Sequence, residues 1–155
     1  MVRALSERIS HEFEFSFLLT DVTDSVKRSG LLILQKQLLS RICTKTDDIS
    51  DVLEGATIIM RLLGNKKVLL ILDDVNHSSH LKYLAGNQEW FGSGSRVLIT
   101  TRDEHLLIEH EVERRLKVEE LNDEDSLMLF SRKAFKKGYP EKDFLGLSKS
   151  FINYA

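Results

Sequence analysis

Residues 66–75 read KKVLLILDDV, and this stretch decides the fold. Its centre, residues 68–72, is apolar at every position, which indicates a strand buried on both faces of a sheet. Strands of that kind lie in the middle of parallel sheets whose two faces are covered by helices. The stretch ends abruptly in Asp73 and Asp74. We therefore predict an α/β sheet with a central strand over residues 67–74 that carries two carboxylates at its end.

The sequence before this stretch predicts one more strand and two helices. Residues 13–19 first alternate between apolar and polar side chains and then become continuously apolar, as expected for a partly buried strand. Behind Gly30, apolar residues recur every three or four positions in two stretches, which predicts two helices packed on the sheet. The two apolar faces consist of Leu31, Leu34, Leu38 and Ile42, and of Val52, Ala56, Ile59 and Leu63.

The sequence after the central stretch continues the alternation of helices and strands. It predicts a helix over residues 81–90, a turn at residues 92–95 and a second buried strand at residues 97–99. Residues 115–118 are predicted to form a final short strand. Strands separated by helices are typical of α/β folds whose strands run mostly parallel.

The last part of the chain has a helical pattern. Asn122 is placed to cap a helix whose first turn is acidic, which complements the positive end of the helix dipole. Gly138 and Pro140 then mark the end of that helix. Residues 141–154 predict one further helix.

The composition excludes several functional classes. The 155 residues carry 22 basic and 24 acidic side chains, a net charge of −2, so no global field attracts nucleic acid. Cys43 is the only cysteine, which excludes an internal disulfide and favours a reducing compartment. The longest apolar runs are far shorter than the roughly 20 residues of a membrane helix. We expect a cytoplasmic, or nuclear, protein that does not bind membranes or nucleic acid.

Asp73 and Asp74 are the first candidate site residues. Ligands of open α/β sheets bind beyond the carboxyl ends of the strands, and carboxylates there hold the Mg²⁺ that bridges nucleotide phosphates. We assign Asp73 to the metal, and Asp74, as the candidate catalytic residue, to a water molecule or the terminal phosphate. The alternative is that both residues begin a turn or cap the next helix, because Asp is common in both roles.

Polar residues also follow the second buried strand. Thr100, Thr101 and Arg102 would leave the sheet at the same edge as the two aspartates. A guanidinium there can bind a γ-phosphate through charge-assisted hydrogen bonds, so Arg102 is the candidate sensor. The alternative for Arg102 is a surface ion pair with a neighbouring acidic residue, Asp103 or Glu104. The two strand ends together favour a nucleotide site.

The chain lacks a segment that would cradle phosphate. No stretch matches G-x-x-x-x-G-K-[ST], whose backbone N–H groups and lysine bind the β- and γ-phosphates. Residues 92–95, GSGS, precede their strand and therefore belong at the wrong edge of a parallel sheet, where a turn is expected. Zinc is disfavoured, because the histidines at positions 77, 80, 105 and 110 have only one distant cysteine to accompany them. No serine occupies a Gly-x-Ser-x-Gly elbow.

Two motifs resemble the NB-ARC domain of plant disease-resistance proteins. Residues 66–75 resemble its Walker B or kinase-2 motif, and residues 92–103, GSGSRVLITTRD, resemble its following sensor motif. Asn76 after Val75, together with residues 100–107, TTRDEHLL, favours the subgroup that carries a TIR signalling domain and leucine-rich repeats.

Two further regions extend this resemblance over nearly the whole chain. Residues 13–30 and 34–39 resemble the region that follows the phosphate loop of the family. Residues 120–130, with Lys133-Ala134-Phe135 after them, resemble the helix that opens the next subdomain. The resemblance implies a P-loop NTPase-like (STAND/NB-ARC) fold, a three-layer arrangement of a parallel sheet and helices that lacks the P-loop strand.

The same resemblance implies a division of the chain and a function. Residues 1–120 would be a partial nucleotide-binding domain, and residues 121–155 would begin the helical ARC subdomain. The family holds ADP at rest, exchanges it for ATP on activation, and then assembles as a full-length receptor into an oligomer. The implied partners are therefore other domains or protomers of a resistance receptor.

The resemblance also gives roles to individual residues. Asp73 would bind Mg²⁺, and Thr101 and Arg102 would bind ADP or ATP. Residues 3–5 resemble the start of the helix after the phosphate loop, so the chain is expected to begin just beyond that loop and to bind nucleotide poorly alone. The missing strand would lie beside residues 97–99, and its loss is expected to expose hydrogen-bonding groups and lower the stability.

Three functional hypotheses follow. The first is a fragment of an ADP/ATP-binding switch in plant innate immune signalling. The second is a turnover NTPase, for which Asp74 is the candidate base. The third is a nucleotide-free remnant or adaptor that acts only through protein–protein contacts.

Overall fold

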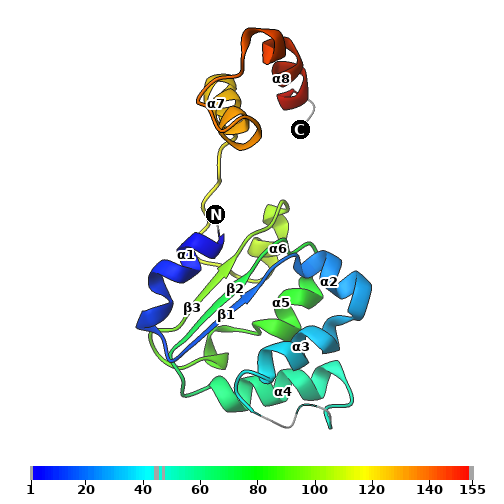
Figure 1. The fold of residues 1–155 in the computed structure, drawn as a ribbon. Helices are drawn as coiled ribbons and strands as arrows, with labels where there is room; N and C mark the ends of the chain where they lie inside the picture. Colours follow the sequence, from blue (N-terminus) through cyan, green and yellow to red (C-terminus); the bar gives the residue numbers. More distant parts are fainter. Residues whose placement is uncertain (1, 44–45, 47, 154–155) are drawn as a thin grey trace. The chain divides into compact units, whose positions relative to one another are not determined.

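A computed structural model describes residues 2–43, 46 and 48–153 of the chain. By the density of its internal contacts, the chain divides into two compact units, Met1–Arg114 and Arg115–Ala155. The first unit contains a sheet and its helices, whereas the regular structure described in the second is helical (Figure 1).

The first unit is built on a parallel sheet, as predicted. Within the described residues this sheet has three strands in the order β1-β2-β3, namely Phe15–Leu19, Val68–Leu72 and Arg96–Ile99. Leu19 lies beside Leu72, and Leu72 beside Ile99, so the three strands end together. All five residues of β2 are buried, which confirms the prediction of a central strand.

Helices lie on both faces of the sheet (Figure 1). One face carries α1, Val2–Ile9, which continues into a short 3₁₀ turn, η1, Ser10–Glu12. The other face carries α3, α4 and α5, which are Leu31–Leu39, Val52–Leu63 and Ser78–Leu84. Two further helices follow strand ends: α2, Val22–Ser29, comes after β1, and α6, Glu104–Glu109, comes after β3. This layering confirms the predicted α/β class.

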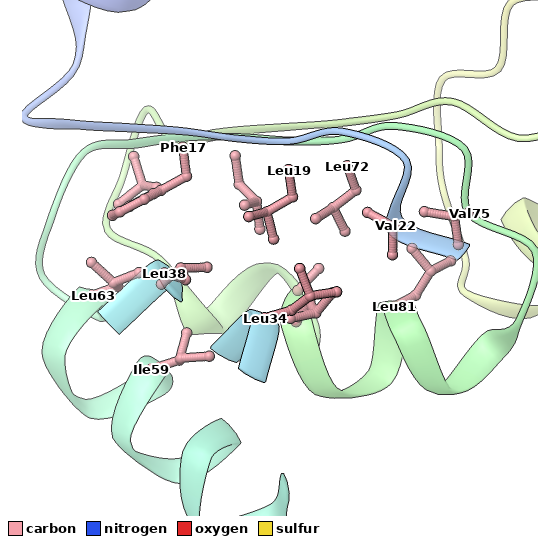
Figure 2. Close-up of a cluster of buried hydrophobic side chains, with 14 of the residues drawn as sticks. Phe17, Leu19, Val22, Leu34, Leu38, Ile59, Leu63, Leu72, Val75 and Leu81 are labelled. Carbon is pink, nitrogen blue, oxygen red and sulfur yellow. The ribbon is translucent and has the colours of Figure 1, made fainter. Parts of the chain in front are cut away.

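The main core lies between the sheet and α3, α4 and α5. Figure 2 shows side chains of the strands pointing toward side chains of these helices. The labelled strand residues are Phe17, Leu19 and Leu72, and the labelled helix residues are Leu34, Leu38, Ile59, Leu63 and Leu81. The predicted apolar faces of α3 and α4 therefore do pack on the sheet.

Two features of the first unit differ from the prediction. A helix that was not predicted, α2, precedes α3; its sequence, VTDSVKRS, has only two valines, too few to show a helical period. The single helix predicted over residues 81–90 is two helices, because α5 ends at Leu84 and a 3₁₀ turn, η2, begins at Gln88. Between them Gly86 has a φ of +55°, and an added Cβ would lie 1.9 Å from the Trp90 ring.

The second unit contains the predicted helices. α7, Asp123–Ala134, begins at Asn122, whose side chain accepts a 2.8 Å hydrogen bond from the backbone N–H of Asp125, as predicted. The predicted last helix begins as a 3₁₀ turn, η3, Lys142–Phe144, and continues as α8, Leu145–Ile152. Its predicted end at residue 154 lies outside the described residues. The strand predicted at residues 115–118 is wrong, because these residues form no strand and are exposed. Their alternation of polar and apolar side chains therefore does not correspond to the two faces of a sheet.

Candidate functional site

The candidate site is at the carboxyl ends of the three strands. The backbone N–H of Asp73 donates to the carbonyl of Leu19 at 2.9 Å, and that of Thr100 donates to the carbonyl of Leu72 at 2.9 Å. These hydrogen bonds continue the ladder of the sheet by one residue beyond β2 and β3. As a result, Asp73 and Thr100 are held side by side on neighbouring strands, at the edge where α/β sheets bind ligands.

Asp73 is joined to Thr100 through its side chain. The hydroxyl of Thr100 donates to Oδ1 of Asp73 at 2.6 Å and accepts from the backbone N–H of Asp74 at 2.9 Å. All three residues are partly buried. One hydroxyl therefore engages the candidate metal ligand and the residue after it.

Asp74 is held in an unusual backbone conformation. Its φ is +59°, in the left-handed region, which Asp tolerates better than most residues. Its carbonyl accepts hydrogen bonds from Thr23, at 2.5 Å from the hydroxyl and 3.2 Å from the backbone N–H. The interpretation of Asp73 and Asp74 as a helix cap is wrong, because the cap of α5 is His77, which accepts from the N–H of Ser79. The backbone bends at Asp74.

The other two predicted residues are not part of this hydrogen-bonded group. The hydroxyl of Thr101 accepts from the backbone N–H of Asp103 at 3.1 Å, and Asp103 in turn caps α6. Arg102 is exposed. Among the described residues, no hydrogen bond joins Thr101 or Arg102 to either aspartate. The structure thus brings Asp73 and Asp74 together with two residues not assigned as ligands, Thr100 and Thr23.

The turn at residues 92–95 lies at the opposite edge of the sheet, as predicted. Gly94 has a φ of +80°, and the hydroxyl of Ser95 donates to the carbonyl of Gly92 at 2.6 Å. The same hydroxyl accepts from the backbone N–H of Val68 at 2.9 Å, at the start of β2. An added Cβ at Gly92 would lie 2.7 Å from the backbone nitrogen of Lys66. This glycine-rich segment therefore lies at the start of β3 and is hydrogen-bonded to the start of β2.

Comparison with known proteins places the chain in a family. The family model described as "NB-ARC domain" matches residues 2–139. The chain belongs to the NB-ARC family. Its resemblance to the NB-ARC domain of plant disease-resistance proteins is therefore confirmed, and the family binds nucleotides.

Several curated proteins are similar to this NB-ARC chain along its length. It is 36% identical to "Disease resistance protein RUN1" of Vitis rotundifolia over 157 aligned residues, which cover 100% of the chain. It is 37% identical to "TMV resistance protein N" of Nicotiana glutinosa over 147 residues, 94% of the chain. It is 37% identical to "Disease resistance-like protein DSC1" of Arabidopsis thaliana over 149 residues, 96% of the chain. The chain spans 12% of the length of each of these relatives.

The residues of this NB-ARC chain fit a magnesium ion that is bound together with a nucleotide. Mg²⁺ prefers oxygen ligands and is usually held by one or two carboxylates, waters and substrate phosphates. Within the described part of the chain, no group of three or more His, Cys, Asp or Glu residues could hold a metal ion. Asp73 can therefore supply one carboxylate, while phosphate and water oxygens would have to complete the coordination.

A separate groove lies away from these strand ends. Its volume is about 560 Å³, and Leu53 and Met60 of α4, Tyr83 of α5 and Trp90 of η2 are among its lining residues. None of the predicted site residues lines it. No helix among the described residues is long and apolar enough to cross a membrane.

Proposed function

We propose that this chain is part of an ADP/ATP-dependent switch in plant innate immune signalling. The observation that carries the proposal is the hydrogen-bonded pair of Asp73 and Thr100, which lies at the ligand-binding edge of a sheet in an NB-ARC chain. The names of the similar proteins, which are resistance proteins, support the signalling context.

In this proposal, the strand ends bind the phosphates of the nucleotide through a magnesium ion. Asp73 binds the ion, Asp74 orients a water molecule or the terminal phosphate, and Thr101 and Arg102 bind the nucleotide. Arg102 is exposed, so its guanidinium is accessible to a phosphate group. The nucleotide then selects between conformations of the receptor, because a ligand stabilises the state that binds it more tightly.

The proposed partners are other domains or protomers of a resistance receptor, in the cytoplasm or nucleus. The share of the relatives that the chain spans, 12%, leaves ample length for such domains in those proteins. Oligomerisation would belong to the full-length form. Turnover hydrolysis with Asp74 as the base remains a hypothesis, and Asp74→Asn would abolish any steady hydrolysis if it were correct.

The exposed apolar residues of the second unit favour the adaptor as a second candidate function. Leu147 and Phe151 of α8 are 68% and 64% exposed. Exposed apolar side chains mark sites of protein–protein contact when they form a contiguous patch. An adaptor would retain its contacts in variants that cannot bind nucleotide.

Isothermal titration with ADP and Mg²⁺ tests the proposed switch. The 155-residue chain is compared with a version extended upstream through a phosphate loop. We expect binding only by the extended version, and at least a tenfold weaker affinity after Asp73→Asn or Arg102→Ala, about 1.4 kcal/mol. The exposed Glu119→Gln, in the segment between α6 and α7, serves as the control. Failure of the extended version to bind would reject the switch and favour the adaptor.

A further inference from the structure

We propose that Thr100 is a positioning residue that orients the carboxylate of Asp73 and fixes the peptide of Asp74. The inference rests on the proposed function, in which Asp73 binds the nucleotide-associated Mg²⁺, and it names the residue that prepares this ligand. Thr101 and Arg102 are the residues of this segment with proposed roles toward the nucleotide, whereas Thr100 acts on the aspartates themselves.

The direction of both hydrogen bonds follows from the groups involved. A backbone N–H can only donate, so Oγ1 of Thr100 must accept from Asp74 at 2.9 Å. An ionised carboxylate can only accept, so the single hydroxyl proton must go to Oδ1 of Asp73 at 2.6 Å. The hydroxyl is therefore oriented by one aspartate while it orients the other.

A second threonine holds the same turn from the other side. Thr23, at the start of α2, donates to the carbonyl of Asp74 through its hydroxyl and its backbone N–H. The backbone N–H of Val22 likewise donates to the carbonyl of Asp73 at 2.9 Å. The Asp73–Asp74 turn is thus attached to β3 through Thr100 and to α2 through Thr23, which leaves the carboxylate of Asp73 little freedom to reorient.

The neighbouring threonine cannot take over this role. The hydroxyl of Thr101 lies 3.1 Å from the backbone nitrogen of Asp103 and accepts its N–H. Consecutive residues of an extended segment point to opposite faces, so only one of the two threonines can face Asp73. In this register it is Thr100.

Nuclear magnetic resonance on the 155-residue chain tests the proposal without a nucleotide. Three-bond couplings from Cγ of Asp73 to its backbone N and C′ report whether χ1 has one value or is averaged. We expect one rotamer in the wild type and in Thr100→Ser, which keeps the hydroxyl, and averaged couplings in Thr100→Val, which has the same shape without it. Amide exchange of Asp74 should also become about fivefold faster in Thr100→Val. Thr57→Val, an exposed threonine of α4, is the matched control.

A second measurement is made on the wild-type chain and on Thr100→Ser. The ¹³Cγ resonance of Asp73 should shift between H₂O and D₂O, because the hydrogen bond transmits the isotope at the Thr100 hydroxyl. Thr100→Ser should keep this shift. Unchanged Asp73 couplings in Thr100→Val, or no isotope shift in a wild-type chain, would overturn the positioning role. The absence of an isotope shift would overturn the positioning role even if Thr100→Val does not fold.

Mn²⁺ separates this inference from the proposed function. As a probe for Mg²⁺, added together with ADP to the extended version used in the titration, it should broaden the amide signals of Asp73 and Asp74 in the wild type and in Thr100→Ser, more weakly in Thr100→Val, and not in Asp73→Asn. If Mn²⁺ with ADP broadens nothing while the couplings still change in Thr100→Val, the positioning role stands and the proposed metal binding fails. If broadening depends on Asp73 but both couplings and broadening ignore Thr100, the metal site stands and the positioning role fails.

Discussion

Gln35 shows how a single polar side chain joins three helices. It is fully buried on α3, and its Nε2 donates to the carbonyl of Val52 at 2.9 Å and to that of Tyr83 at 2.8 Å. Its Oε1 faces Gly55 of α4, where an added Cβ would lie only 2.3 Å away. A glycine in the middle of a helix normally costs stability, but here it makes room for the amide that links α3 to α4 and α5.

Gly55→Ala is therefore expected to destabilise the first unit by about 1–3 kcal/mol, in spite of the higher helix propensity of alanine. The new methyl group would displace the Gln35 amide and break its two hydrogen bonds. Urea unfolding followed by circular dichroism measures the change. The control is Gly146→Ala in α8, where an added Cβ meets nothing within 4 Å. An unchanged midpoint for Gly55→Ala would show that Gln35 can move at no cost.

His80 makes the stability depend on pH. It is buried on α5, its Nδ1 has no hydrogen-bond partner among the described residues, and burial, followed by the charge of His77, lowers its pKa below the ordinary 6.5. The unfolded chain then binds the proton more readily than the folded chain. Above about pH 6.5 His80 is neutral in both states and does not reduce the free energy of unfolding. As the pH falls through and below that value, protonation of the unfolded chain lowers the free energy of unfolding.

Urea midpoints at pH 7.5 and 5.5 check this prediction, because most carboxyl groups titrate at lower pH. We expect a lower midpoint at pH 5.5 in the wild type and a smaller difference in His80→Leu. His105→Leu, at an exposed position of α6, should behave like the wild type. An equal pH effect in His80→Leu would assign the dependence to other groups.

At the scale of elements, the start of α4 is specified by its own sequence. The side chain of Asp51 accepts from the backbone N–H groups of Leu53 and Glu54, both at 2.8 Å. Glu54 reaches back to accept from the backbone N–H of Ser50 at 2.9 Å, and this hydrogen bond is the main reason that the pKa of Glu54 is lowered. This arrangement resembles a capping box, except that Glu54 accepts from the residue before the N-cap and not from Asp51 itself. It begins the helix that carries Ile59 and Leu63 into the core.

Asp51→Ala should lower the free energy of unfolding of the first unit by about 1 kcal/mol, because two N–H groups lose their acceptor. Asp51→Asn should retain most of the stability, since its amide oxygen still accepts. Urea unfolding compares both variants with Glu89→Ala, at an exposed position. A loss as large in Asp51→Asn as in Asp51→Ala would indicate that the charge matters more than the hydrogen bonds.

At the scale of the whole molecule, the two units are connected by an exposed segment without regular structure. Residues 113–121 are exposed and belong to no helix or strand. Leu116 and Val118 within it are 88% and 66% exposed. Proteases cleave preferentially in segments of this kind, because the backbone can adopt the extended form that the protease binds.

Limited trypsin digestion should therefore cut first after Arg114, Arg115 or Lys117 and release an N-terminal fragment that contains the sheet. Mass spectrometry identifies the first cut. Replacing these three residues with Gln should slow the release of that fragment, whereas replacing Lys142 with Gln should not. A first cut inside α4 or β2 would show that the sheet unfolds more readily than the connection is cleaved.

Local patterns determined most of the elements, because the information lies within a few consecutive residues. The five apolar residues of β2 predicted a central strand, and the spacing of Ile59 and Leu63 predicted the buried face of α4. Asn122 predicted the start of α7. Two predictions based on local patterns failed. The sequence of α2 has too few apolar residues to show a helical period, and residues 115–118 alternate between polar and apolar side chains but pair with no strand.

The sequence by itself determined the family, the central strand and the presence of Asp73 and Asp74 at its end. Only the tertiary structure decided which neighbours these aspartates meet. The pairing of Leu72 with Ile99 places Thr100, and not Thr101, beside Asp73. The start of α2 lies beside the same strand end, so that Thr23 donates to the carbonyl of Asp74. Strand register has this effect because successive side chains point to opposite faces, so a shift of one residue would exchange the two threonines. That register depends on packing between residues far apart in the chain.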